Sequence, residues 1–194
     1  KRKVNQAVAE LDFVPNSVAA ALSSKQSGRV ALLLKMNTKT QAIDEIDMQY
    51  LSGAIHKATE LGLDVITFFF SMFEGKSAEE VTRYLLSQSI HGIILYGMSK
   101  EDKVLHKIIE SQVFKTVVVD APVFNGNTSS VWVNQEQAQY DVARKTVEEN
   151  KGRSILYIAG KKNGYVSEER LKGIRRLARE KGLKLLVRNG EFSE

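Results

Sequence analysis

Short apolar segments alternate with longer amphipathic ones along most of this chain, and this alternation restricts its possible folds more than any other feature. The apolar segments are strand-sized and recur about every 25 to 35 residues. They are 30–34, 65–70, 93–96 and 116–119. Continuous apolar strands are typical of a parallel sheet covered on both faces. The pattern predicts an α/β fold with a doubly wound parallel sheet and right-handed crossovers.

The segments between these strands carry helix signals. The first predicted helix has five apolar residues on one face, at the spacing of helical turns. They are Met48, Leu51, Ile55, Ala58 and Leu61. In the second helix, Ser77 is suited to the capping position, and Glu79 and Glu80 lie in the first turn, where the helix dipole favours acidic groups. A third helix is predicted over residues 101–110.

The period breaks at residues 120–128, a turn-rich segment that contains one of the two prolines, Pro122. We place the boundary between two lobes there. The first lobe is expected over residues 29–120, and the crossover with the second lobe over residues 121–194.

The second lobe shows the same alternation over a shorter length. Asn134 and Gln137 have the spacing of a capping box at the start of a helix. Strands are predicted at 154–159 and 184–187, with a helix at 167–181 between them. Because a parallel lobe normally needs more than two strands, we expect this lobe to be partial.

The first 28 residues have a different character. A short helix is predicted at residues 4–11, within a first segment of residues 1–14. Residues 15–28 form a second segment that begins with Pro15 and Asn16 and has an alanine-rich middle. A helix of this length is unstable alone in water, so the segment either docks against another surface or is a linker with a helical tendency.

This N-terminal arrangement resembles the joint of the LacI-type (LacI/GalR family) bacterial transcriptional regulators. The resemblance rests on the helix that ends at Leu11, the turn from Asp12 to Asn16, and the helix that contains Ala19 and Leu22. It implies that residues 1–14 are the last helix of a helix-turn-helix headpiece and that residues 15–28 are a hinge helix. It further implies a two-lobed body like that of periplasmic binding proteins.

The same resemblance implies operator DNA as a partner. The hinge residues Asn16, Val18, Ala19 and Leu22 would lie in the minor groove, with Leu22 wedged between base steps. The recognition helix that reads the major groove would precede Lys1, so the chain is expected to be a fragment of a longer regulator. A homodimer through the body helices, including residues 47–61, is expected.

Composition limits other classes of function. The absence of cysteine excludes disulfides and zinc–thiolate sites. The apolar runs are too short for a membrane span, and the first residues lack the apolar core of a signal peptide. We therefore expect a cytoplasmic protein without a membrane partner.

The net charge of +5 is poor evidence for DNA binding, because the basic residues are concentrated at 151–188. A solvated helix face is favoured there for Arg175, Arg176 and Arg179 over a patch for an acidic partner or nucleic acid. His56, His91 and His106 have no metal-ligand spacing.

No constellation of catalytic residues is present, so neither a metal, a cofactor nor an enzyme activity is expected. The loop Gly160–Gly164 lacks the Gly-Lys-Ser/Thr ending of a phosphate loop. An enzyme with a doubly wound fold is therefore the weakest of the functional hypotheses.

Polar and aromatic residues follow the predicted strands at their carboxyl ends, where open α/β sheets bind ligands. They are Lys35, Phe70, Tyr96 and Asp120. A sugar would suit such a site, since rings pack against its apolar face and charged groups take its hydroxyls. The alternative for each is a loop residue without a ligand, and for Phe70 a place in the core.

The family resemblance adds a partner for Asp120. Arg170, in the sequence Arg170-Leu171-Lys172-Gly173-Ile174, matches the family's Arg-x-x-Gly-aromatic motif, whose arginine reaches the effector from the second lobe. We expect Asp120 and Arg170 to face each other, with a sugar or sugar phosphate between them. The expected function is effector-responsive regulation of transcription, with repression as the expected form. The alternative is a two-lobed, periplasmic-type sugar-binding protein of transport.

Overall fold

The computed structural model describes residues 28–35 and 45–190 of the chain. The predicted headpiece segment 1–14 lies outside the described residues. So do residues 15–27 of the predicted hinge, including its proposed DNA-binding residues Asn16, Val18, Ala19 and Leu22.

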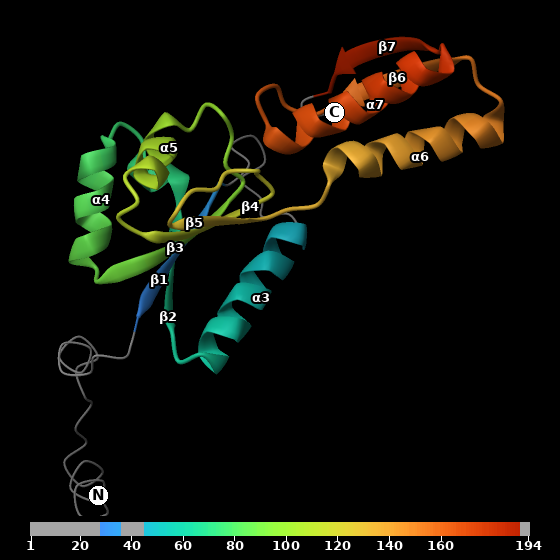
Figure 1. Cartoon of the computed structure of the whole chain (residues 1–194). Helices are drawn as coiled ribbons and strands as arrows, with labels where there is room; N and C mark the ends of the chain where they lie inside the picture. Colours follow the sequence, from blue (N-terminus) through green and yellow to red (C-terminus); the bar gives the residue numbers. More distant parts are fainter. Residues whose placement is uncertain (1–27, 36–44, 191–194) are drawn as a thin grey trace, which may run out of the picture.

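The first lobe is built on a five-stranded sheet in the order β2-β1-β3-β4-β5 (Figure 1). All of its strand pairs are parallel, which confirms the predicted doubly wound sheet. The strands are β1 (Arg29–Leu34), β2 (Asp64–Phe69), β3 (Ile90–Tyr96), β4 (Lys115–Val119) and β5 (Thr128–Val131). The central strand β1 has the sequence RVALLL, and its last four residues are buried, as expected for a strand covered on both faces.

Helices cover both faces of this sheet: α4 (Ala78–Ser87) and α5 (Lys103–Glu110) lie on one face and α3 (Glu45–Glu60) on the other (Figure 1). The predicted cap of α4 is confirmed as a reciprocal capping box. The Glu80 amide donates to Ser77 Oγ at 3.2 Å, and the Ser77 amide donates to the Glu80 carboxylate at 2.8 Å. Between α4, α5 and the sheet lies the main core, which includes Leu33, Leu85 and Phe114.

Helix α3 contributes little to that core. Of the apolar face predicted from its sequence, Ala58 is buried, whereas Met48 is 47% and Ile55 44% exposed. An apolar strip on this helix therefore stays at the surface of the single chain.

Two details of the first lobe differ from the sequence prediction. Phe70, predicted as the last residue of a strand, begins the 3-10 turn η1 (Phe70–Phe73). Strand β5 was not predicted at all, because its sequence TSSV is too polar to resemble a buried strand. It pairs with β4, so the first sheet continues beyond the predicted crossover at residues 120–128.

The second lobe contains α6 (Gln135–Asn150), β6 (Ser154–Ala159), α7 (Tyr165–Lys181) and β7 (Lys184–Asn189). Strands β6 and β7 form a parallel two-stranded sheet, and the predicted cap of α6 is confirmed by the Gln137 amide, which donates to Asn134 Oδ1 at 3.0 Å. Helix α7 begins two residues earlier than predicted. Arg170 therefore lies in the second helical turn rather than the first.

Helices α6 and α7 run side by side over one face of the β6–β7 pair (Figure 1). The core of this lobe is small and centred on Ala143, Ile174 and Leu177. On the other face of the pair, Leu156 and Ile158 are exposed. Among the described helices, none combines the length and the apolar character that a membrane crossing requires.

Candidate effector-binding site

Asp120 is the first residue after β4 and has a left-handed backbone, with φ of 58°. This conformation costs free energy for a residue other than glycine, and it is held by the Asp120 amide, which donates to the Val131 carbonyl at 2.9 Å. Burial raises the pKa of the Asp120 carboxyl, and the charge of Arg170 partly opposes that rise. Within the described residues the carboxylate makes no hydrogen bond. A half-buried carboxylate without a donor is a group that a ligand can satisfy.

Arg170 reaches the same region from α7 in the second lobe. Its Nε donates to Gln135 Oε1 at 2.8 Å, and Gln135 is the first residue of α6. This contact restrains the orientation of the guanidinium. Its two terminal nitrogens have no hydrogen-bond partner within the described residues, so they remain available to a ligand.

Arg170 in the second lobe lies near enough to Asp120, at the end of β4, for its charge to lower the pKa of the Asp120 carboxyl. Their charges interact, yet in the described part of the chain they form no ion pair within 4.0 Å. A polar molecule can donate a hydrogen bond to such a carboxylate and accept one from such a guanidinium.

Aromatic rings lie beside this charged pair. Tyr96, the last residue of β3, packs against Tyr50 of α3 in a tilted arrangement, with ring centroids 4.8 Å apart. Burial, followed by the charge of Asp120, raises the pKa of the Tyr50 hydroxyl. On the other side, burial raises the pKa of Tyr157 in β6, whereas the charge of Arg170 lowers it. The charges of Asp120 and Arg170 thus act on the hydroxyls of Tyr50 and Tyr157, respectively, and Tyr96 is linked to them through its ring contact with Tyr50.

Sequence reasoning missed Tyr50, Tyr157 and Gln135. None of them follows the carboxyl end of a strand, and the prediction from strand ends selected only residues at such positions. Tyr50 lies early in α3, away from the apolar face that the helical spacing indicated. Its juxtaposition with Tyr96 arises from the packing of α3 on the sheet and has no local signal.

Lys35 follows β1, as predicted, but its ammonium is already engaged within the first lobe. Its Nζ donates to both carboxylate oxygens of Asp102, at 2.8 and 2.9 Å, and to Ser99 Oγ at 3.2 Å. The Ser99 amide and hydroxyl donate to the same carboxylate, at 2.7 and 2.8 Å. Lys35, Ser99 and Asp102 are therefore a closed polar network beside the proposed site.

The loop that carries this network also contacts the second lobe. Ser99 and Gly164 form an isolated antiparallel bridge, and the Lys100 amide donates to the Asn163 carbonyl at 3.1 Å. Lys100 also pairs with Glu168 of α7. The phosphate-loop-like segment Gly160–Gly164 thus serves as a contact between the lobes.

Phe70 packs against the main core, partly buried, which agrees with the alternative that it is a core residue. Its contact with an effector stays a prediction. Within the described ranges, 28–35 and 45–190, no group of three or more His, Cys, Asp or Glu side chains is arranged to hold a metal ion.

Replacing Asp102 by asparagine should remove an acid-sensitive part of the stability. Burial raises the pKa of Asp102, but the hydrogen bonds from Lys35 and Ser99 outweigh it, so the folded pKa lies below the ordinary value. A carboxyl group whose pKa is lower in the folded state stabilises the fold at pH values above its unfolded-state pKa. This stabilisation is lost as the pH falls through the folded-state pKa. We expect Asp102→Asn to cost about 1–2 kcal/mol at pH 7, measured by urea denaturation.

Below the ordinary carboxyl pKa of about 3.9, the difference between this variant and the wild type should shrink. Glu110→Gln, an exposed change near the end of the same helix, is the matched control and should leave stability nearly unchanged. An Asp102→Asn penalty that is the same at acidic and neutral pH would contradict the assignment.

Two parallel α/β lobes joined by a crossover define the class of two-lobed, periplasmic-binding-protein-like domains. The family model of periplasmic binding proteins and the sugar binding domain of the LacI family matches residues 29–191. The chain belongs to this family.

Curated relatives include two regulators that are each 26% identical to the whole chain. They are the HTH-type transcriptional regulators AscG of Escherichia coli and CelR of Thermobifida fusca. The catabolite control protein A of Staphylococcus aureus is 23% identical over 95% of the chain. The chain spans a little over half of these relatives, 57% of the first two and 54% of the third.

Solved structures show the same fold. The Lac repressor bound to ONPG superimposes with a TM-score of 0.76 at 20% identity, over 99% of this chain and 57% of the repressor chain. A complex of the transcriptional regulator CelR with cellobiose superimposes with a TM-score of 0.68 at 22% identity, over 98% of this chain and 56% of that one.

Proposed function

We propose that this chain contains the effector-binding body of a LacI-type transcriptional regulator, and that a sugar or sugar phosphate binds between its lobes. The observation that supports the proposal is that the half-buried carboxylate of Asp120, and the two terminal nitrogens of Arg170 in the other lobe, have no hydrogen-bond partner within the described residues. A sugar has hydroxyls that donate to a carboxylate and accept from a guanidinium, and its apolar face suits a tyrosine ring. Relatives that carry the names of transcriptional regulators, and the solved complex of a regulator named CelR with cellobiose, support this class of ligand.

The contacts between the lobes offer a route from effector binding to DNA. A ligand that contacts both Asp120 and Arg170 changes the preferred orientation of the lobes, because it binds one orientation better than the other. The Ser99–Gly164 bridge and the Lys100–Glu168 pair must adapt to that change. Residues 15–28 would then pair or separate in the operator minor groove, through Asn16, Val18, Ala19 and Leu22, in a bacterial cytoplasm.

The test is a thermal-shift screen of sugars and sugar phosphates, followed by calorimetry with each compound that stabilises the protein. A saturable 1:1 complex with a sugar supports the proposal. If no sugar or sugar phosphate shifts the unfolding transition, the effector class is wrong.

The exposed strip on α3 distinguishes a regulator from a solute-binding protein of transport. A regulator that reads a two-fold operator is expected to be a dimer, and Met48 and Ile55 offer a surface for it. We expect Ile55→Glu to weaken the dimer at least about ten-fold, because it places an unpaired charge in an apolar interface. Sedimentation at tens of micromolar measures this change.

Gln49→Glu is the matched control, since it adds the same charge on another side of α3. It should leave the dimer intact. A wild-type chain that sediments strictly as a monomer would favour the solute-binding alternative.

A further inference from the structure

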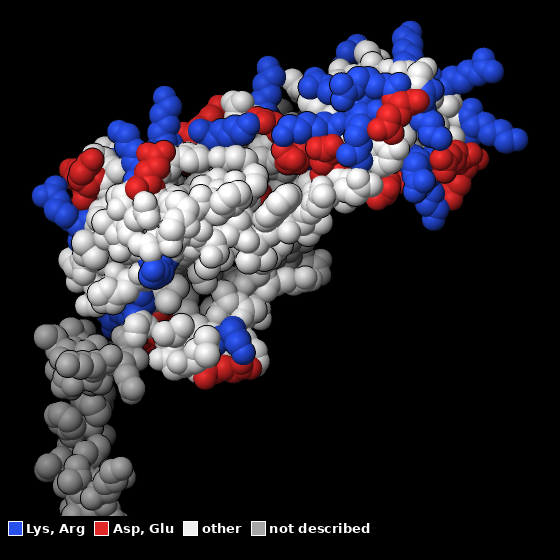
Figure 2. Space-filling model, in the orientation of Figure 1, with Lys and Arg blue, Asp and Glu red and all other residues white. Residues whose placement is uncertain are grey.

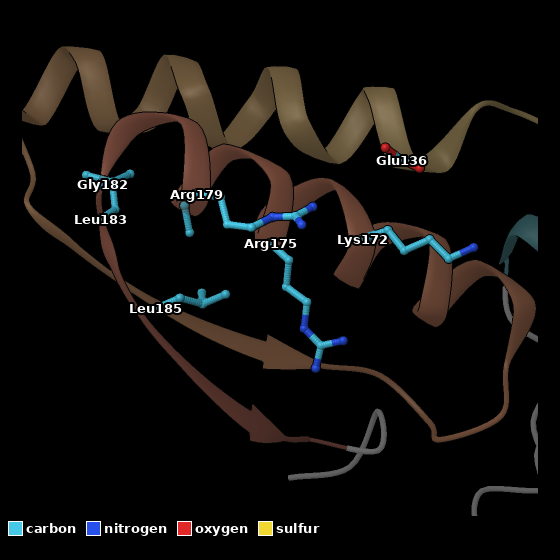
Figure 3. Close-up of a pocket in the computed structure, with 8 residues that line it drawn as sticks. Glu136, Lys172, Arg175, Arg179, Gly182, Leu183 and Leu185 are labelled. Atoms are coloured by element: carbon cyan, nitrogen blue, oxygen red, sulfur yellow. The ribbon is translucent and has the colours of Figure 1, made fainter.

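A pocket of about 650 Å³ lies on the second lobe, and it shares no residue with the group around Asp120 (Figure 3). Its lining combines cationic and apolar side chains from α7, from β7 and from the turn between them. They are Lys172, Arg175, Ala178, Arg179, Leu183 and Leu185. This volume is typical of pockets that hold small molecules.

Two cations of this pocket are unpaired. Arg175 and Arg179 are separated by four residues and therefore lie on the same side of α7. Within the described part of the chain, neither guanidinium group makes an ion pair or a hydrogen bond. Arg176 differs, because it donates to Glu136 at 2.8 Å and stacks on the Tyr140 ring at 4.2 Å.

The remaining charges at the pocket are largely neutralised by each other. Lys172 pairs with Glu169, and the Glu136 carboxylate is occupied by Arg176. The net charge that a ligand meets therefore comes from Arg175 and Arg179. Figure 2 shows that Lys and Arg side chains gather over this lobe, so the surrounding field also favours an anion.

The floor of the pocket is apolar. Gly182 takes a left-handed conformation with φ of 61° and turns the chain from α7 directly into β7. Leu183 and Leu185 line the pocket together with Ala178, and Arg175 extends from α7 toward the β6–β7 pair (Figure 3). The apolar floor and the cationic rim together suit a molecule that has an anionic group and an apolar body.

We propose that this pocket binds a small organic anion, with its phosphate or carboxylate at Arg175 and Arg179 and its apolar body on Leu183 and Leu185. The site is separate from the proposed effector site between the lobes. An anion there relieves the repulsion between the two guanidinium groups and covers the apolar floor. This gives the protein a second small-molecule input.

Phenyl phosphate is a suitable probe, because it carries a dianion on an apolar ring. In calorimetry with the intact protein, we expect it to bind more tightly than inorganic phosphate, and phenol to show no binding. Arg175→Gln and Arg179→Gln should each weaken phenyl phosphate about ten- to one hundred-fold, the range for a charge-assisted hydrogen bond. Arg153→Gln removes an exposed arginine of the same lobe that does not line the pocket, and should change nothing.

Backbone amide NMR shifts of the wild-type protein locate the probe independently of any variant. Shifts centred on 182–185 support the proposal. Shifts centred on Asp120 and Arg170, equal binding by both glutamine variants and the wild type, or equal loss in Arg153→Gln would each overturn it. Because the probe site and the sugar site share no residue, failure here leaves the sugar assignment intact, and failure of the sugar screen leaves this site intact.

Discussion

Replacing Gly173 by alanine is expected to destabilise the second lobe by about 1–3 kcal/mol, the usual cost of forcing a methyl group into a filled space. A Cβ at this position would lie 2.2 Å from the Glu136 carbonyl oxygen and 3.1 Å from the Tyr140 amide nitrogen. Both are backbone atoms of α6, so no side chain can rotate away. Helices α6 and α7 would have to separate, which opens the small core around Ile174 and Leu177.

Urea denaturation followed by circular dichroism at the helical band measures this loss. Gly53→Ala is the matched control: Gly53 is also inside a helix, and a Cβ there meets nothing within 4 Å. Alanine should be neutral or stabilising at that position, by up to about 1 kcal/mol. If Gly173→Ala unfolds at the same urea concentration as the wild type, the close contact of the two helices is not formed in solution.

Gly173 explains in physical terms why the Arg-x-x-Gly-aromatic motif, which the sequence matched only by family resemblance, contains a glycine. In Arg170-Leu171-Lys172-Gly173-Ile174, Gly173 allows α7 to approach α6. That approach brings Gln135, at the start of α6, within reach of Arg170. The motif therefore couples helix packing to the orientation of Arg170, which we propose contacts the effector.

Much of the fold could be predicted because its signals are local. Ser77 and Asn134 cap the helices that their spacing indicated, and β6 has the predicted bounds. Strand β5 escaped prediction because its hydrogen bonds to β4, rather than its composition, make it a strand. The start of α7 was predicted two residues late, since Gly164 makes no side-chain cap.

The candidate site was partly predictable for a related reason. Strand ends indicated Asp120, Tyr96 and Lys35, because sheet geometry alone places such residues at one edge. The residues that these side chains contact are distant in the sequence and are brought to them only by tertiary packing. The Lys35 ammonium donates its hydrogen bonds to Asp102, and Tyr50 contacts Tyr96 only because α3 packs on the sheet.

Asp120→Asn and Arg170→Gln should each weaken binding of the sugar or sugar phosphate by about 1.5–3 kcal/mol, roughly ten- to over one hundred-fold. Each change removes a charge from a hydrogen bond that the proposed ligand makes with one lobe. The two losses should not add, because both hydrogen bonds form fully only when the lobes hold the same ligand. Calorimetry on the wild type, both single variants and the double variant measures this coupling.

A pair elsewhere on the second lobe provides the control. Asp141 and Arg144 lie 3.7 Å apart on exposed α6, and Asp141→Asn with Arg144→Gln makes the same charge changes away from the lobe junction. These variants should bind the ligand as the wild type does. Unchanged affinity in Asp120→Asn and Arg170→Gln would show that the ligand binds elsewhere.

The pH dependence of binding supplies an independent readout for Asp120. Burial raises the pKa of its carboxyl, whereas hydroxyl donors of a sugar favour the carboxylate and lower that pKa again. Binding therefore releases protons, and affinity should fall as the pH drops through the raised pKa of the free protein. Asp120→Asn cannot titrate and should lose this part of the pH dependence while it keeps the rest. An identical pH profile in the variant would assign the proton release to another group and remove Asp120 from the site.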